Sequence, residues 1–96
     1  MGSYKLSSRA ALDIAEIFEY GIHKFGLSQA QKYLNELESS LHKLPDRAEL
    51  RKDASFIRPA LCRYKFNSHI VFFTLEGENI FIVRILGQFM DFKRHL

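Results

Sequence analysis

The sequence has one cysteine, Cys62, and no tryptophan among its 96 residues. A single cysteine excludes an intrachain disulfide, which fits a reducing compartment, and we expect a cytoplasmic protein. The four histidines are scattered, without the spacing that is typical of a metal site. We therefore expect neither a metal nor a cofactor.

Long apolar runs are also lacking, since even the longest uninterrupted apolar stretches are about the length of residues 80–83. Such runs cannot span a membrane, and no membrane association is expected. Lys5, Arg9 and Asp13 interrupt any apolar core of a signal peptide. What the sequence does have is an ordinary globular composition, with 47% hydrophobic residues. Its length is typical of one domain, residues 1–96.

Neither sign of charge dominates the sequence, whose net charge is +3. Residues 1–42 carry four Lys/Arg and five Asp/Glu, whereas residues 43–96 carry ten and six. The second part of the chain is therefore the basic part. An anionic partner and a solvated surface with a mild charge bias both explain this distribution.

Residues 8–44 predict two helices joined as an antiparallel hairpin, because their apolar residues recur at helical spacing in two stripes. A serine at position 7 or 8 is the expected N-cap of the first helix, and Gly26 is expected to end it. Ser28 is the expected N-cap of the second helix, with Gln31 at the capping-box position. The stripes consist of Ala11, Ile14, Ala15, Phe18, Ile22 and Phe25, and of Ala30, Tyr33, Leu34, Leu37, Leu41 and Leu44.

Four strands are predicted around this hairpin, which gives an α+β fold. Residues 3–7 form the first strand, which has no local partner and should join a sheet edge. Residues 45–59 contain both prolines and predict a loop with one helical turn. Three alternating or apolar strands with short turns then predict an antiparallel meander, followed by a short C-terminal segment. These strands are residues 60–66, 69–75 and 80–87.

The last strand is apolar on both faces, a pattern that normally means burial on both sides of a sheet. One helical hairpin covers only one face. The second face should be covered by the C-terminal segment folding back, by a second copy of the chain, or by a partner; left exposed, it would be an apolar interaction patch. Strict alternation points Phe81, Val83 and Ile85 toward the helices, and Ile80, Ile82, Arg84 and Leu86 toward the second face.

Arg84 therefore lies on the second face, where Arg63 and Lys65 join it if Cys62, Tyr64 and Phe66 face the helices. A buried guanidinium without a partner would be costly. Arg84 should reach solvent, bind an anion, or form a salt bridge with Asp91 or the chain terminus.

The order of these elements resembles the RelE/ParE superfamily of bacterial toxins, and the details resemble ParE. Residues 4–26 are similar to that family's Y-x-L-S start and D-(I/L)-x-x-I-x-x-Y helix. The most specific match is the terminal motif R-(I/V)-L-x-x-x-M-D-x-x-x-H-L, at residues 84–96. The resemblance covers nearly the whole chain and implies the RelE/ParE-like fold.

The resemblance also implies a function. ParE proteins are toxins of type II toxin–antitoxin systems that inhibit DNA gyrase by protein–protein binding and trap it on cleaved DNA. A ParD-like antitoxin neutralises them, in a 2:2 or higher complex, by laying a helix on the hairpin and an extended arm along the sheet.

The alternative function is that of a ribosome-dependent mRNA endonuclease of RelE type. Arg63, Lys65 and Arg84 could hold a phosphate, but RNA cleavage also needs groups that transfer protons. His95 is the one candidate acid or base near the C-terminus. We therefore predict no catalytic residues, no enzymatic activity and no sequence-specific contact with nucleic acid.

Two sets of binding residues are predicted. The C-terminal set should contact the target, because two Phe and one Met in a terminal segment have the composition of a binding anchor; the alternative is that Phe89, Met90 and Leu96 plug the sheet. The target-binding set is Phe89, Met90, Phe92, Lys93, Arg94 and His95. The antitoxin-binding set is Ile17, Phe18, Leu34, Leu37, Arg58, Arg63, Lys65, Ile80, Ile82 and Arg84.

Overall fold

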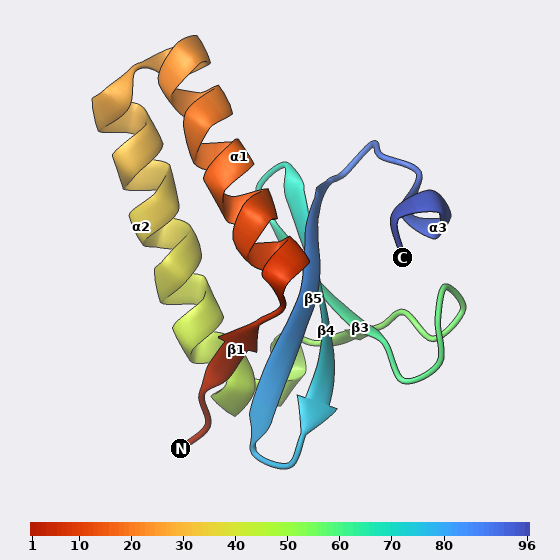
Figure 1. The fold of residues 1–96 in the computed structure, drawn as a ribbon. Coiled ribbons are helices and arrows are strands. Elements are labelled where there is room, and N and C mark those ends of the chain that lie inside the picture. The colour runs from red at the N-terminus through yellow and green to blue at the C-terminus, as the bar shows by residue number, and fades with distance from the viewer.

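The computed structural model describes residues 1–96 as a five-stranded sheet with a helical hairpin packed on one face (Figure 1). Strand β1 (Tyr4–Leu6) leads into helices α1 (Ser8–Phe25) and α2 (Leu27–Lys43), which form the hairpin. The predicted α+β fold is confirmed. No helix has the length and apolar character that a membrane crossing requires.

The sheet has the strand order β1-β5-β4-β3-β2. Strands β3 (Cys62–Phe66), β4 (His69–Glu76) and β5 (Asn79–Gly87) form the predicted antiparallel meander. Strand β1 pairs with β5 in parallel at one edge, as expected for a strand without a local partner. The first and last strands of the chain are therefore neighbours.

The segment predicted as a loop contains more structure than expected. Two single-turn 3₁₀ helices, η1 (Leu44–Asp46) and η2 (Ala48–Leu50), precede strand β2 (Lys52–Asp53). This two-residue strand pairs antiparallel with β3 and forms the other edge of the sheet. It is too short to show alternation, so the sequence pattern could not reveal it.

Only one of the two hairpin helices begins with the predicted kind of N-cap residue. Ser7 caps α1, since its Oγ accepts from the Ala10 amide (2.9 Å) and donates to the Val83 carbonyl (2.7 Å). Gly26 ends α1 as predicted, at φ 93°. The prediction of Ser28 as N-cap of α2 is wrong, because Gly26 is itself the N-cap. A glycine at positive φ reverses the chain within one residue, which places Ser28 inside the first turn.

The main core lies between the hairpin and the sheet, and it corrects the predicted strand faces. Ile80 and Ile82 are buried here under the helices, so their assignment to the second face is wrong. The cause is a β-bulge: Arg84 pairs with Phe72 and Ile82 with Phe73, which leaves Val83 unpaired. The extra residue interrupts the alternation, as bulges do. The helix-facing core comprises Ala10, Leu37, Leu41, Leu44, Phe66, Val71, Phe73, Ile80, Ile82 and Ile85.

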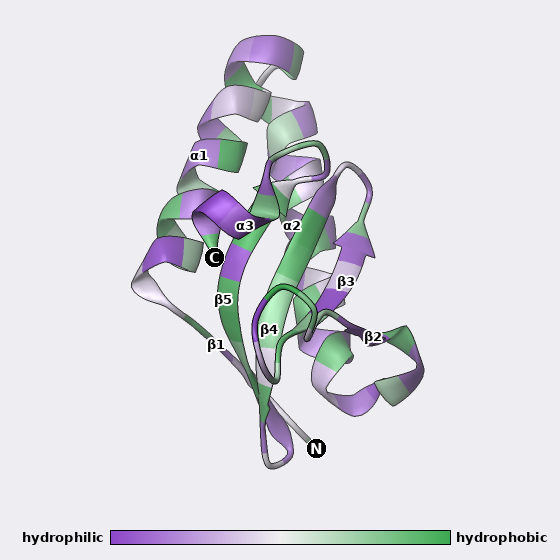
Figure 2. Cartoon of the chain, turned by 90° about the vertical axis from the view of Figure 1, so that its right-hand side faces the viewer, coloured by the Kyte–Doolittle hydropathy of each residue, from purple (hydrophilic) through white to green (hydrophobic).

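A second, smaller core covers the opposite face of the sheet. Residues 54–61 and the short C-terminal helix α3 (Phe92–His95) lie over this face (Figure 2). Phe72 is fully buried there, and the ring of Phe92 packs edge-on against it with centroids 5.0 Å apart. Of the three covers expected for this face, the structure shows the C-terminal segment, together with the 54–61 loop, so a second copy of the chain or a partner is not needed to seal it. The cluster comprises Ala54, Leu61, Ile70, Phe72 and Leu86, with Ile57, Val83, Phe92 and Leu96 packed against it.

We predict that Phe92→Ala destabilises the fold whereas Phe89→Ala does not. Phe92 would lose its ring contact with Phe72 and part of its buried area, so the free energy of unfolding should fall by about 1–3 kcal/mol. Phe89 is 93% exposed, and its truncation should change stability by less than about 0.5 kcal/mol. Urea titrations of both variants measure this. Equal stabilities would mean that α3 does not seal the sheet in solution.

Candidate functional site

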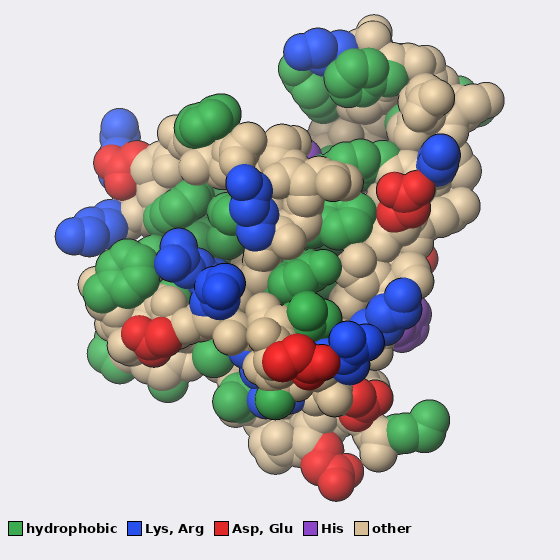
Figure 3. All heavy atoms as spheres, turned by 180° about the vertical axis from the view of Figure 1, so that it is seen from behind, with side chains coloured by type: hydrophobic (Ala, Val, Ile, Leu, Met, Phe, Trp, Pro, Cys, Tyr) green, Lys and Arg blue, Asp and Glu red, His purple; other side chains and the backbone are tan.

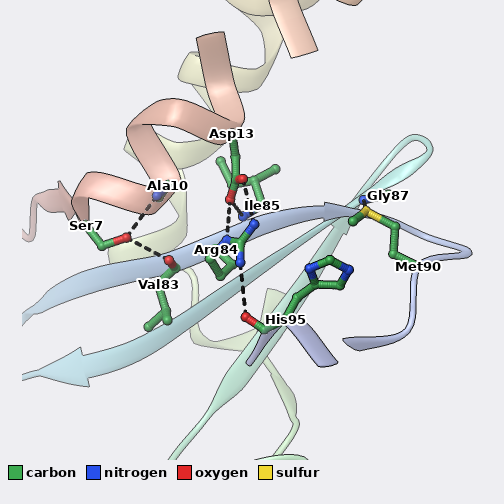
Figure 4. A network of polar contacts seen from close by, with 9 residues as sticks. All are labelled: Ser7, Ala10, Asp13, Val83, Arg84, Ile85, Gly87, Met90 and His95. Atoms are coloured by element: carbon green, nitrogen blue, oxygen red, sulfur yellow. Dashed lines mark hydrogen bonds and ion pairs between the residues drawn. The ribbon is translucent and has the colours of Figure 1, made fainter. Parts of the chain in front are cut away.

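The polar centre of the molecule is a buried ion pair between Asp13 of α1 and Arg84 of β5 (Figure 4). Arg84 Nε donates to Asp13 Oδ2 (2.8 Å) and Arg84 Nη2 to Asp13 Oδ1 (2.9 Å). The same Oδ2 accepts from the Ile85 amide (2.9 Å). The side chains are only 10% and 8% exposed. This bidentate geometry is the strong form of an arginine–carboxylate contact, and its hydrogen bonds raise the pKa of Arg84.

The Asp13–Arg84 ion pair also reaches the C-terminal helix, because Arg84 Nη1 donates to the His95 carbonyl (3.0 Å). One guanidinium thus joins α1, β5 and α3. Of the alternatives given for Arg84, a salt bridge with a carboxylate is confirmed, but the carboxylate belongs to Asp13 and not to Asp91 or the chain terminus. Asp13 lies three residues after Ala10 and four before Ile17, on the helix face that packs inward. That spacing was the signal that could have identified the partner.

Next to the ion pair, four arginines from four segments line one cleft of about 430 Å³, here called the arginine cleft. Three of them, Arg58, Arg84 and Arg94, belong to the predicted binding sets, as does His95. Sequence reasoning missed Arg9, which lies in the first turn of α1 and shows no pattern that connects it to the C-terminus. The full lining is Ser7, Arg9, Arg58, Val83, Arg84, Arg94 and His95.

A second concave surface, here called the hairpin groove, lies between α1, α2 and the β3–β4 turn. It has a volume of about 510 Å³ and a mixed apolar and polar lining. Figure 3 shows hydrophobic side chains in the recess below the hairpin tip, which is at the upper right of that view. Its lining includes Ile17, Phe18, Tyr20, Phe25, Leu34, Tyr33 and His69.

The structure separates the predicted antitoxin residues into accessible and inaccessible ones. Ile17, Phe18 and Leu34 are half-buried and line the hairpin groove. Leu37 and Ile82, by contrast, are completely buried, and Ile80 is 1% exposed, so a docking role for these three is wrong in this conformation. Their apolar spacing is that of a core, which sequence alone cannot distinguish from the rim of a groove.

The arginine and lysine predicted on β3 do face away from the helices. Lys65 is exposed. Arg63 is half-buried and lies over the ring of Phe56, with its guanidinium carbon 5.6 Å from the ring centroid. The structure does not bring either residue into the arginine cleft.

The C-terminal segment is divided in the same way. Phe89 is 93% exposed and Met90 is 40% exposed, at the turn between β5 and α3. Lys93, Arg94 and His95 are also exposed. Phe92 instead is half-buried and packs its ring on Phe72, so it offers less surface to a target than its neighbours do. A four-residue helix presents one side to the sheet and the other to solvent.

His69 and Tyr33 form a hydrogen-bonded pair at the edge of the hairpin groove, with Tyr33 Oη and His69 Nδ1 2.7 Å apart. Burial lowers the pKa of His69 and raises the pKa of Tyr33. In the neutral imidazole, Nδ1 can accept a hydrogen bond from the Tyr33 hydroxyl, so this arrangement suits the uncharged ring.

Comparisons with known proteins identify the family of the chain and match its fold. A family model described as "ParE toxin of type II toxin-antitoxin system, parDE" matches residues 4–92. Toxin ParE1 of Caulobacter vibrioides is 30% identical over 96 residues, which cover 100% of this chain and 99% of that protein. Toxin ParE1 of Mycobacterium tuberculosis is 32% identical over 94 residues, 97% of this chain and 96% of the relative. A solved structure of the chromosomal ParDE TA system from P. aeruginosa shares the fold: the TM-score is 0.77 at 21% identity, over 91% of this chain and 96% of that chain.

We predict that Asp13→Ala strongly destabilises the protein. The change leaves Arg84 buried without its carboxylate, and breaking a buried ion pair typically costs about 3–5 kcal/mol. Chemical denaturation measures the loss. The matched control is Glu49→Gln, which breaks the exposed ion pair with Arg47 and should leave the midpoint unchanged. A small effect of Asp13→Ala would mean that solvent reaches Arg84.

We also predict that His69 makes stability depend on pH. Because burial lowers its folded pKa below the usual 6.5, the unfolded chain binds a proton more readily as pH falls below that value, and the free energy of unfolding decreases. The contribution is fully present above about pH 6.5 and is lost below it. Between about pH 7.5 and about pH 5.5, the urea midpoint should therefore decrease more for the native protein than for His69→Gln. Equal decreases would contradict a depressed pKa.

Proposed function

The chain belongs to the ParE toxin family of type II toxin–antitoxin systems, and we propose that it inhibits DNA gyrase by protein–protein binding. In this proposal the bound toxin traps gyrase on cleaved DNA. A ParD-like antitoxin neutralises it in a 2:2 or higher complex, in the cytoplasm and without a cofactor.

One observation supports target binding above the others: the turn after β5 exposes Phe89 almost completely. By contrast, the neighbouring aromatic residue Phe92 packs against the second core. Phe89 thus stays exposed although a phenylalanine three residues away is packed inward. An aromatic side chain left in water next to exposed Met90 is typical of a residue that a partner buries. We therefore assign Phe89 and Met90, with Lys93, Arg94 and His95 beside them, to the target surface.

The hairpin groove supports the antitoxin part of the proposal. An amphipathic helix binds a groove through apolar residues on one of its faces. Ile17, Phe18 and Leu34 offer a complementary apolar floor. Tyr20 and Phe25, which are 61% and 63% exposed, extend it toward the hairpin tip.

The mRNA endonuclease remains the alternative, and the arginine cleft argues against it. Cleavage of RNA requires one group to take a proton from the ribose 2′-hydroxyl and another to protonate the leaving oxygen. The cleft contributes one imidazole, His95, among arginines that stay protonated. This set suits holding an anion better than transferring protons.

The proposed function predicts opposite outcomes in two assays with the purified protein. It should accumulate cleaved DNA with gyrase and leave ribosome-bound mRNA intact. Phe89→Ala should lower the gyrase effect at least tenfold, as expected for an anchor worth about 2 kcal/mol, while keeping antitoxin binding. Leu75→Ala is the control, since Leu75 is 48% exposed at the far end of β4. Cleaved mRNA with unaffected gyrase would refute the proposal in favour of the endonuclease.

A further inference from the structure

The arginine cleft holds positive charge that the protein does not neutralise. The molecule has two ion pairs, Arg47–Glu49 and Asp13–Arg84. The other three arginines of the cleft, Arg9, Arg58 and Arg94, therefore have no acidic partner. No carboxylate lines the cleft.

These three arginines come from three segments that only the fold brings together. Arg9 lies in the first turn of α1, Arg58 in the loop over the second face, and Arg94 in α3. The N-terminus of α1, where Ser7 is the cap, also opens onto the cleft, and its dipole adds positive potential. Like charges gathered in one concavity repel each other, so the arrangement is stabilised by an anion.

We propose that the arginine cleft binds the phosphate backbone of double-stranded DNA without reading its sequence. The inference deepens the proposed function and rests on it, because gyrase held on cleaved DNA is where the toxin would meet this DNA. Guanidinium groups bind phosphate oxygens in a bidentate manner. Three of them, on separate segments around one cleft, suit a ligand with several charges in a row rather than a single ion.

The lining of the cleft favours DNA over an acidic peptide as its ligand. Val83 is the only apolar residue that lines it. A protein segment gains most of its affinity from apolar anchors in desolvated pockets, whereas binding to DNA comes mostly from phosphate contacts. The apolar floor needed by a peptide belongs to the hairpin groove instead.

The location of the cleft connects it to the proposed target surface. Arg94 and His95 belong to both, and the backbone of His95 is fixed by Arg84. Contacts to gyrase through Phe89 and to DNA through the arginines could therefore be made by one continuous surface at the C-terminal end of the chain. Such a joint contact explains how a small protein could stabilise a complex of enzyme and cleaved DNA.

The test measures binding of the purified protein to a short fluorescent DNA duplex across salt concentrations, with two unrelated sequences. Each neutralised phosphate contributes about 0.9 to the slope of log K against log salt. The triple variant Arg9→Gln, Arg58→Gln, Arg94→Gln should therefore bind at least tenfold more weakly, with a slope smaller by about 2.7. Both sequences should behave alike.

A matched control removes the same charge elsewhere. Lys5→Gln, Lys43→Gln, Lys52→Gln changes three exposed lysines outside the cleft and should keep the slope of the native protein. Because Arg58 is half-buried, the double variant Arg9→Gln, Arg94→Gln, at two exposed positions, is measured as well and should lower the slope by about 1.8. Equal losses in the triple variant and the lysine control would overturn the proposal, since the attraction would then be diffuse.

A gyrase assay separates this inference from the proposed function. If the native protein leaves gyrase unaffected but binds DNA through the cleft, the proposed function fails and the cleft assignment stands. If the native protein traps gyrase and the triple variant does so equally well with unchanged DNA affinity, the cleft assignment fails. Weaker binding of an acidic antitoxin segment by the triple variant, with DNA affinity unchanged, would also refute it and identify a carboxylate-rich peptide as the ligand.

Discussion

The buried ion pair between Asp13 and Arg84 is the contact on which the arrangement of the surfaces depends. Each of the two charges would be strongly unfavourable alone in the interior. Together they fix the first half of α1 to the middle of β5, and the third nitrogen of Arg84 fixes the backbone of α3. The position of the C-terminal segment relative to α1 is thus set by a directional contact.

Two layers of packing determine which parts of this chain remain available to partners. The hairpin covers one face of the sheet, and residues 54–61 with α3 cover the other (Figure 1). The apolar side chains that stay exposed include Tyr20 and Phe25 toward the hairpin tip, Phe56 in the loop over the second face, and Phe89 at the turn after β5. The hairpin and α3 lie on opposite faces of the sheet, so a partner on one surface need not occupy the other.

The sequence allowed the fold to be predicted because its periodic segments are long. The two helical stripes and the meander follow directly from spacing and turn residues. The faces of β5 could not be predicted, because the bulge at Val83 depends on pairing with β4 and leaves no mark in the alternation. The same shift placed Ile80 and Ile82 on the wrong side. The arginine cleft itself was not predicted: Arg58 and Arg84 were placed in the antitoxin-binding set and Arg94 in the target-binding set, and only the tertiary fold brings them together with Arg9.

The parallel pairing of β1 with β5 has a consequence for synthesis on the ribosome. Tyr4 pairs with Ile80, and Asp13 bonds Arg84 across 71 positions of sequence. While the ribosome is translating the middle of the chain, neither contact exists, because β5 has not been synthesised. The carboxylate of Asp13 in α1 then lacks its partner Arg84. Contacts between distant segments form late because closing a long loop lowers the chain entropy before the stabilising contacts are made. The nascent chain therefore cannot assemble the arginine cleft until Arg94 and His95 have emerged from the ribosome. A shorter nascent chain carries the apolar hairpin without the surface formed by residues 84–95.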